Sequence, residues 1–124
     1  MAGTNLYAFY GSLRRGMANY NIYRYGLKYI ETRRVFGYEL LTLGKYPYAV
    51  KSPHPSCSIV VEIFEVENEN VRKAIHQMEG EAGYVLVPIE VDGKRVGIYL
   101  FERAGNELRV NGGDWVKFFG TGGK

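Results

Sequence analysis

The chain has 124 residues, of which 46% are hydrophobic and 23% are charged, and its formal net charge is +3 at pH 7. This composition excludes a chain that is disordered throughout, and the length suits one domain, residues 1–124, around one core. No run approaches the roughly 20 apolar residues of a membrane-spanning helix, and the N-terminus lacks the pattern of a signal peptide, so we expect a cytoplasmic protein without a membrane partner.

The first predicted element is a buried strand at residues 6–10, which are apolar and aromatic without a charge. Gly11 and Ser12 end the strand, and the turn leaves backbone N–H groups that can converge on an anion or an oxyanion. Gly11 has no Cβ and would therefore let the backbone approach a ligand closely. The alternative is a plain strand and turn followed by a solvated pair, Arg14 and Arg15.

A short helix is expected next, from Asn19 to Gly26, with Asn19 as its cap and with Ile22 and Tyr25 facing inward. Three segments follow it. Residues 32–43 alternate loosely and are expected to form one or two strands. Residues 45–55 hold three of the four prolines and are expected to form a loop. Residues 58–66 are expected to form a strong strand.

A second helix is indicated by apolar residues at helical spacing, Val71, Ala74, Ile75 and Met78. Asn68 suits its N-cap and Gly80 its C-terminal end, so Glu79 would end the helix on the stripe that faces the core. Burial and the negative end of the helix dipole would both raise the pKa of Glu79, making it a better base near neutral pH. The alternative places Glu79 in solvent with Glu81.

A β-hairpin is predicted at residues 84–91 and 95–103, because Asp92-Gly93-Lys94 between them is a favoured turn. Pro88 would have to lie at a sheet edge or a bulge, since it cannot donate a ladder hydrogen bond. Near the end of the chain, three aromatic residues are expected to pack down as a last element, Trp115, Phe118 and Phe119. The final residues, 120–124, are expected to form a frayed tail.

The sequence predicts no metal site and no disulfide. Cys57 is the only cysteine and is expected to be a buried, inert thiol at the start of a strand. His54 lies between two prolines and His76 on the charged face of the second helix, so both are expected in solvent. A Ser-His-Asp triad stays open, although the Gly-x-Ser-x-Gly turn is absent.

Four short motifs occur in order along the chain. They are Tyr10-Gly11-Ser12-Leu13-Arg14-Arg15-Gly16 with Asn19, Tyr46-Pro47, Val61-Glu62-Ile63-Phe64-Glu65-Val66, and Ile75-His76-Gln77-Met78-Glu79-Gly80 with Tyr84. Together they resemble the γ-glutamylcyclotransferase-like family, especially its γ-glutamylamine cyclotransferase branch, over nearly the whole chain. The third motif lacks the family's Gly. His76 stands for the family's Asp and Leu86 for a common Arg, which leaves the substrate's identity open.

The resemblance implies an α+β fold, described as a small mixed β-barrel with flanking helices. It also implies a reaction within the substrate, in which the α-amino group of a γ-glutamyl amine or γ-glutamyl amino acid attacks the side-chain carbonyl and releases 5-oxoproline. Glu79 matches the family's catalytic Glu and would act as general acid and base. The residues expected to bind the substrate are Tyr10, Gly11, Ser12, Leu13 and Tyr84.

In this implied mechanism, the backbone N–H groups of Gly11, Ser12 and Leu13 and the Ser12 hydroxyl would bind substrate oxygen. Tyr10 and Tyr84 would wall the pocket and orient the substrate through their hydroxyls. The only partner is then a small γ-glutamyl molecule, because the nucleophile belongs to the substrate and neither metal nor cofactor is required.

A second hypothesis is a non-enzymatic small-barrel module that binds an acidic metabolite or nucleic acid. Eleven tyrosines and three basic pairs, Arg14-Arg15, Arg33-Arg34 and Lys94-Arg95, favour it. The pairs are dispersed, however, and 13 acidic residues stand against 16 basic ones, so no nucleic-acid partner is expected. The sequence leaves the oligomeric state open.

Overall fold

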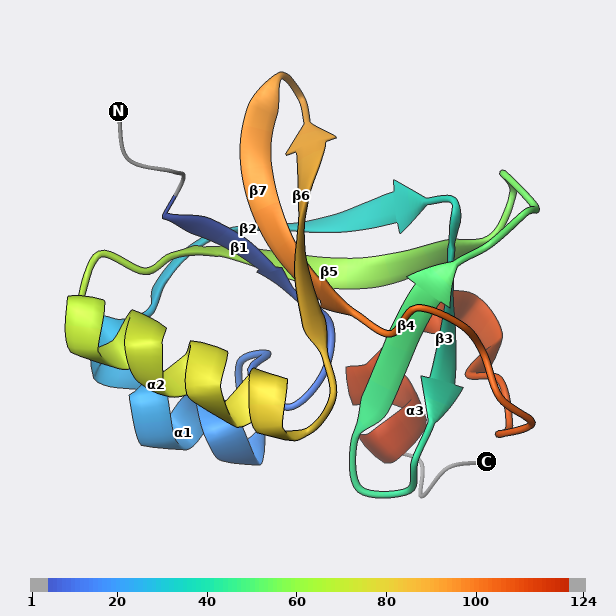
Figure 1. Ribbon diagram of the computed structural model, residues 1–124, viewed down its shortest axis with the longest axis horizontal. Helices are drawn as coiled ribbons and strands as arrows, with labels where there is room; N and C mark the ends of the chain where they lie inside the picture. The colour runs from blue at the N-terminus through green and yellow to red at the C-terminus, as the bar shows by residue number, and fades with distance from the viewer. Residues whose placement is uncertain (1–4, 121–124) are drawn as a thin grey trace.

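The computed structural model describes residues 5–120, so most of the expected C-terminal tail lies outside the described range. Figure 1 shows the elements. In chain order they are β1 (Leu6–Phe9), α1 (Ala18–Tyr23), η1 (Arg24–Gly26), β2 (Lys28–Phe36), β3 (Tyr38–Thr42), β4 (Pro47–Lys51), β5 (Ser58–Glu65), α2 (Glu69–Glu81), β6 (Val85–Val91), β7 (Lys94–Leu100), η2 (Asn111–Gly113) and α3 (Trp115–Gly120).

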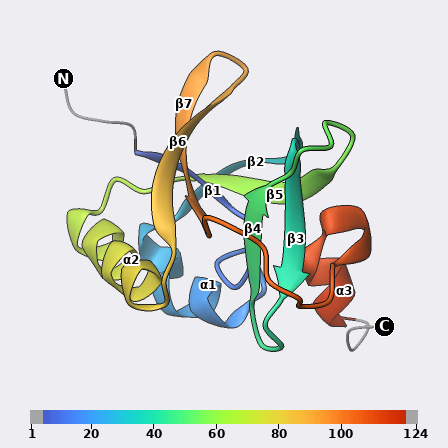
Figure 2. The ribbon, with the colours of Figure 1, turned by 45° about the vertical axis from the view of Figure 1, so that its right-hand side comes forward.

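Two sheets organise the chain, one of five strands in the order β2-β5-β1-β7-β6 and one formed by β3 and β4. β1 pairs antiparallel with β5 and parallel with β7. Figures 1 and 2 show α1 and α2 side by side, and α3 next to β3. The α+β class is confirmed. "Barrel" describes the fold only loosely, because β2 and β6 are edges that do not pair with each other.

The central strands are the ones whose sequences are apolar on both faces. β1 is buried from Tyr7 to Phe9, and β5 is buried from Ile59 to Phe64. Strands covered on both faces read as continuous apolar runs rather than alternating ones, which is why both were predictable. Of the two Glu residues in β5, Glu62 is buried, at 3% exposed, and Glu65 lies at the strand's partly exposed end.

The predicted second helix is confirmed and runs two residues further than expected, to Glu81. The Asn68 side chain caps it by accepting a hydrogen bond from the Val71 N–H at 3.1 Å. Val71 and Ile75 are its buried residues, as the apolar spacing predicts. None of the helices within residues 5–120 combines the length and apolarity needed to cross a lipid bilayer.

The predicted hairpin is also confirmed, as β6 and β7. Asp92 and Gly93 form its turn with φ of 51° and 78°, a left-handed conformation that Gly adopts freely and Asp tolerates. Pro88 lies on β6, the edge strand, as its missing N–H requires. β7 begins at Lys94 and ends at Leu100, so it is shifted from the expected residues 95–103.

The prediction for the first helix is wrong in its cap and in its inward face. The N-cap of α1 is Met17, and Asn19 lies inside the helix. Ile22 is 61% exposed and Tyr25, in η1, is 75% exposed. The inward face is instead the one that carries Tyr20 and Tyr23, which pack against the core, so the other face meets solvent.

The expected loop at residues 45–55 is wrong as well, because it contains β4. Tyr48, Ala49 and Val50 in this strand are 2% exposed or less. Pro47 is the first residue of β4, a position where a strand tolerates the missing N–H. The prediction was wrong because it relied on the proline content of the segment. Residues 47–51 form a strand because they pair with β3.

The predicted last element exists as α3. Trp115 is fully buried and stacks on Phe118, with ring centroids 5.6 Å apart. Phe119 also contacts Trp115 but stays 46% exposed, so it packs only in part. Cys57 comes one residue before β5 and is partly exposed, which corrects the expectation of a buried thiol.

Candidate active site

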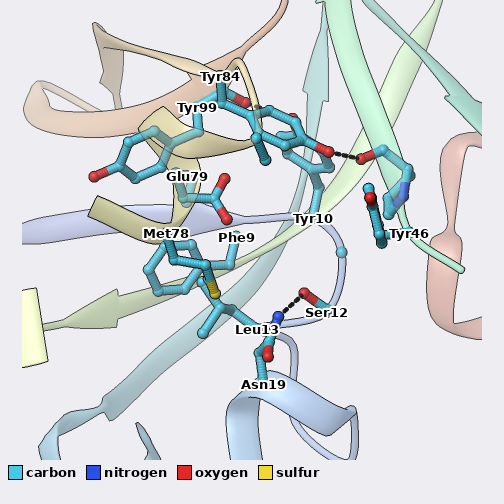
Figure 3. A pocket seen from close by; sticks show the side chains of 14 residues that line it. Phe9, Tyr10, Ser12, Leu13, Asn19, Tyr46, Met78, Glu79, Tyr84 and Tyr99 are labelled. Atoms are coloured by element: carbon cyan, nitrogen blue, oxygen red, sulfur yellow. Dashed lines mark hydrogen bonds between the residues drawn. The ribbon is translucent and has the colours of Figure 1, made fainter. Parts of the chain in front are cut away.

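A cavity of about 230 Å³ lies where the turn after β1 meets the C-terminal end of α2 and the start of β4 (Figure 3). Every residue that the sequence predicted for the site lines it, namely Tyr10, Gly11, Ser12, Leu13, Glu79 and Tyr84. Further lining residues that the site prediction did not include are Ala8, Phe9, Asn19, Tyr46, Pro47, Met78, Ala82 and Tyr99. The fold thus brings β1 and its turn, α1, the start of β4, the end of α2 and β7 to one cavity.

Glu79 points its carboxyl into this cavity (Figure 3). Its backbone carbonyl accepts hydrogen bonds from the N–H groups of Ala82 and Tyr84, at 3.2 and 3.0 Å, so the helix end is ordered around it. Among residues 5–120 no ion pair or hydrogen bond reaches the carboxylate. Burial therefore acts unopposed and raises the pKa of Glu79 to about 7. Such a carboxyl can both take and return a proton near neutral pH.

The turn after β1 is held by its carbonyl groups and leaves N–H groups free. The carbonyls of Gly11 and Ser12 accept hydrogen bonds from the N–H groups of Arg14 and Tyr20, each at 3.0 Å. Within the described residues, no hydrogen bond uses the N–H of Gly11, Ser12 or Leu13. The turn therefore offers backbone donors at the cavity, which is the arrangement needed to hold an anion or an oxyanion.

Gly11 is required by packing against the protein itself. A Cβ placed on Gly11 would lie 2.8 Å from Cδ of Pro47, too close for any side chain. This close approach joins the first and second sequence motifs, Tyr10-Gly11-Ser12 and Tyr46-Pro47, on one wall of the cavity. Close approach of a ligand is the reason for Gly11 that the sequence suggests. The structure adds a second reason for a glycine at this position, which is packing against the Pro47 ring.

Asn19 orients the Ser12 hydroxyl. Its Nδ2 donates a hydrogen bond to Ser12 Oγ at 2.7 Å (Figure 3). Because that oxygen already accepts from Asn19, the hydroxyl hydrogen of Ser12 is free to be donated to a ligand. Asn19 thus acts inside the site, where the sequence had assigned it to the cap of a helix.

Tyr10 and Tyr84 wall the cavity with hydroxyl groups that the fold already uses. Tyr10 donates to the backbone carbonyl of Tyr99 at 2.5 Å and accepts from the Ala49 N–H at 3.2 Å. Tyr84 donates to the carbonyl of Pro47 at 2.5 Å. Burial raises the pKa of both phenols, so both stay protonated. Their hydroxyl hydrogens are therefore already donated within the protein.

The departures from the family pattern at residues 76 and 86 lie outside the lining of the cavity. Leu86 lies on β6, where its side chain packs over Gly97. His76 is exposed, as predicted, and its Nδ1 lies 3.0 Å from the hydroxyl of Tyr99, a lining residue. The change at residue 86 thus leaves the cavity wall untouched, and the change at residue 76 reaches it only through Tyr99.

Neither histidine lines the cavity, so Ser12 has no histidine base there and the Ser-His-Asp alternative fails at this site. Across residues 5–120, no group of three or more His, Cys, Asp or Glu side chains is arranged to hold a metal ion.

Both arginines after the turn are anchored by ion pairs, Arg14 buried and Arg15 half-exposed. Arg14 is 6% exposed, and its guanidinium donates to Glu62 at 2.8 Å and to Asp114 at 2.7 Å. Arg15 donates to the second oxygen of Glu62 through its backbone N–H and its Nε, each at 3.0 Å. Glu62 on β5 therefore ties the turn to the sheet, and Asp114 ties it to the start of α3.

Comparison with known proteins matches this site to a family. A family model described as gamma-glutamyl cyclotransferase, AIG2-like, matches residues 7–117, which include the whole cavity lining. The chain belongs to this family. The resemblance found in the sequence motifs is thereby confirmed.

Solved structures of similar fold are also found. An uncharacterized protein from Pyrococcus horikoshii has a TM-score of 0.80 at 25% identity, with 96% of each chain covered. A uropathogenic E. coli-specific protein has a TM-score of 0.77 at 25% identity, with 96% of this chain and 98% of its own covered. An AIG2-like protein from Mus musculus shares the fold, with a TM-score of 0.57 at 19% identity over 83% of this chain and 79% of its own. No curated protein sequence matches the chain.

Replacing Gly11 with Ala is expected to lower the free energy of unfolding by about 1–3 kcal/mol, because the new methyl group overlaps the Pro47 ring. Urea unfolding measures this. Gly80→Ala is the matched control, since a Cβ there meets nothing within 4 Å on a helix. It is expected to raise stability by roughly 0.5–1 kcal/mol. Equal effects of the two changes would contradict the packing argument.

Proposed function

We propose that this AIG2-like family member is a γ-glutamyl cyclotransferase that releases 5-oxoproline from a γ-glutamyl amine or γ-glutamyl amino acid. The observation that carries the proposal is the unpaired carboxyl of Glu79, with a pKa of about 7, in a cavity beside free N–H donors. Membership of the family supports it independently. Glu79 would be the catalytic residue, and the turn of Gly11, Ser12 and Leu13 would bind the substrate.

In the proposed reaction, Glu79 takes a proton from the α-ammonium of the substrate. The freed nitrogen lone pair then attacks the γ-carbonyl carbon, and the carbonyl electron pair moves to oxygen. Backbone N–H groups of the turn and the Ser12 hydroxyl would stabilise that oxyanion. When it collapses, the bond to the leaving nitrogen breaks as Glu79 returns the proton. Glu79, ionised again, takes the second proton from the ring nitrogen and passes it to the released amine, which leaves as an ammonium.

This chemistry suits a cavity with few polar groups, because the substrate carries its own nucleophile. Ring closure within one molecule needs the enzyme mainly to hold the chain bent and to exclude water. The walls formed by Tyr10, Tyr84 and Tyr99 are aromatic and buried, which supports such a role.

The alternative of a basic binding module receives less support. Arg14 is buried in ion pairs, and Arg33 pairs with Asp92. Arg34 donates to Ser58 and to the carbonyl of Gly112. Two of the three basic pairs are thus engaged with the protein itself, which favours a small-molecule substrate.

We further propose one enzymatic domain over residues 1–124 and a cytoplasmic location. A single cysteine that forms no disulfide is compatible with a cytoplasmic location.

The test is 5-oxoproline release from γ-glutamyl substrates by the wild-type protein. Each substrate is paired with its α-N-acetyl form, which keeps the scissile bond and loses the nucleophile. Release from the free amines alone is the expected result. Release of glutamate in place of 5-oxoproline would indicate hydrolysis by water and contradict the proposal. No product from any substrate would also contradict it.

A further inference from the structure

The turn after β1 is closed by Arg14. The Arg14 N–H donates to the carbonyl of Gly11 at 3.0 Å, so Gly11 and Arg14 are the first and last residues of the turn that carries the proposed backbone donors. Arg14 does not line the cavity, and its side chain is 7% exposed. Whatever holds this side chain therefore acts on the cavity through the backbone of the turn.

Two carboxylates from different elements hold the Arg14 guanidinium. Its Nε donates to Glu62 Oε2 at 2.8 Å, and its Nη1 donates to Asp114 Oδ1 at 2.7 Å. Glu62 lies within β5, and Asp114 directly precedes α3. Bonds through two different nitrogens of a planar group fix its orientation as well as its place. Either contact alone would leave the guanidinium able to turn about the remaining bond.

Asp114 is itself held in place. Its Oδ1 also accepts the Lys117 N–H at 3.2 Å, as the side chain of a helix cap does. The preceding residue, Gly113, lies so close to β5 that an added Cβ would be 2.2 Å from the carbonyl oxygen of Ser58. The carboxylate that meets Arg14 is therefore fixed by its neighbours, although its side chain is 29% exposed.

We propose that Asp114 is a positioning residue for the reaction, which acts through Arg14 to hold the N–H donors of the turn where the oxyanion forms. The proposal rests on the proposed function and goes beyond it, because none of residues 111–120 lines the cavity. Figures 1 and 2 show α3 and α2, the helix that carries Glu79, at opposite sides of the molecule. Donors stabilise an oxyanion only when they are placed for it in advance, and a displacement of about 1 Å can cost roughly 100-fold in rate. A short helix outside the cavity thus sets the geometry of the donors inside it.

The first test replaces Asp114 with Ser and with Asn. Both residues cap helices well, but the Ser side chain is too short to reach Arg14, whereas Asn keeps an oxygen at the same place. Asp114→Ser is expected to lower kcat for 5-oxoproline release by about tenfold and to change KM by less than about twofold, because displaced donors weaken binding of the transition state more than binding of the substrate. Asp114→Asn should keep more of kcat than Asp114→Ser. An equal loss in both would show that the contact with Arg14 is not responsible, and would overturn the proposal.

Asp92→Asn is the matched control. Asp92 also pairs with an arginine, Arg33, but neither of these residues lines the cavity. Asn tolerates the positive φ of residue 92, so this variant should keep the kcat of the wild type. Thermal unfolding fixes a temperature at which every variant is folded, and kcat is compared there, so that lost stability is separated from lost catalysis. A loss of kcat in this control as large as that in Asp114→Ser would contradict the proposal.

The second test observes the turn directly. In proton–nitrogen correlation spectra, the amide resonances of Gly11, Ser12 and Leu13 are expected to shift in Asp114→Ser and to shift less in Asp114→Asn. Unmoved resonances in Asp114→Ser would overturn the proposal at any level of activity. A wild type that releases no 5-oxoproline contradicts the proposed function itself, whereas an active wild type with full kcat in Asp114→Ser contradicts only the positioning role.

Discussion

Glu79→Gln is expected to lower kcat for 5-oxoproline release by about 10²- to 10⁴-fold, because the amide can no longer take a proton from the α-ammonium. The change keeps the size and shape of the side chain and replaces one carboxyl oxygen with an NH2 group, so KM should move far less than kcat. Steady-state kinetics on the best γ-glutamyl amide measures both values. Glu81→Gln is the matched control, since Glu81 is exposed on the same helix end and contacts only Gln77 among the interactions described.

The pH dependence of the wild type tests the same assignment. The base must be ionised, and the pKa of Glu79 is about 7, so kcat/KM should rise with pH through that value. The acid limb should be lost in whatever activity Glu79→Gln retains. An unchanged acid limb in the variant would assign that titration to another group and contradict the role of Glu79.

Stability should change in the opposite sense to activity. A carboxyl whose pKa is raised by folding binds its proton more tightly in the folded state. The free energy of unfolding therefore falls as pH rises from about 4.5 to about 7. Above pH 7 the buried Glu79 of the wild type is ionised, which lowers its free energy of unfolding. Glu79→Gln cannot ionise, so the variant should be at least as stable as the wild type at this pH. Thermal unfolding at pH 8 then separates loss of catalysis from loss of fold.

Arg14→Met is expected to have the largest effect on stability. Glu62 is 3% exposed and relies on Arg14 and Arg15 as its partners. Removing the buried guanidinium leaves Glu62 with only the half-exposed Arg15, and breaking a buried pair from one side typically costs about 3–5 kcal/mol. Urea unfolding at pH 7 measures this cost.

Arg33→Ala serves as the control, because Arg33 pairs with an exposed Asp92 and such a pair is worth about 0–1 kcal/mol. The double change Arg14→Met and Glu62→Leu should recover part of the loss, since it removes both buried charges. If Arg14→Met cost no more than Arg33→Ala, the buried ion pairs would not be what anchors the turn.

The parts of the fold that could be predicted carry their signal locally. Asn68 and the apolar spacing to Met78 define α2, and they place Glu79 at the end of its buried stripe. Asp92-Gly93 defines the hairpin, because few other residues adopt positive φ at both positions. These signals are independent of what packs against the segment.

The errors occur where contacts distant in sequence decide the outcome. β4 forms because residues 47–51 pair with β3, a partner that the proline content of the segment does not reveal. Arg14 is buried because Glu62 and Asp114, 48 and 100 residues away, meet it below the turn. Periodicity in a six-residue helix is too short to fix its inward face, which explains the error at Ile22.

The residues of the candidate site that belong to the sequence motifs could be predicted. The lining residues that reach the cavity only through the fold could not. Glu79 and the turn after β1 stand in recognisable sequence patterns. Tyr99 comes from the middle of a strand and reaches the cavity only because β7 pairs with β1. Asn19 was visible in the first motif, but the sequence assigned it as the cap of a helix, and only the folded turn brings its Nδ2 to the Ser12 hydroxyl.

The helix that carries Asn19 has no buried residue, whereas β1 and β7, which carry the lining residues Phe9 and Tyr99, are mostly buried. Segments with little buried surface open locally at lower free energy than the core. Amide hydrogen exchange should therefore be fastest in Ala18–Tyr23 and slowest in β1 and β5. One wall of the cavity is then mobile while the opposite wall is fixed, so the Ser12 hydroxyl can lose and regain its Asn19 partner without any unfolding of the sheet.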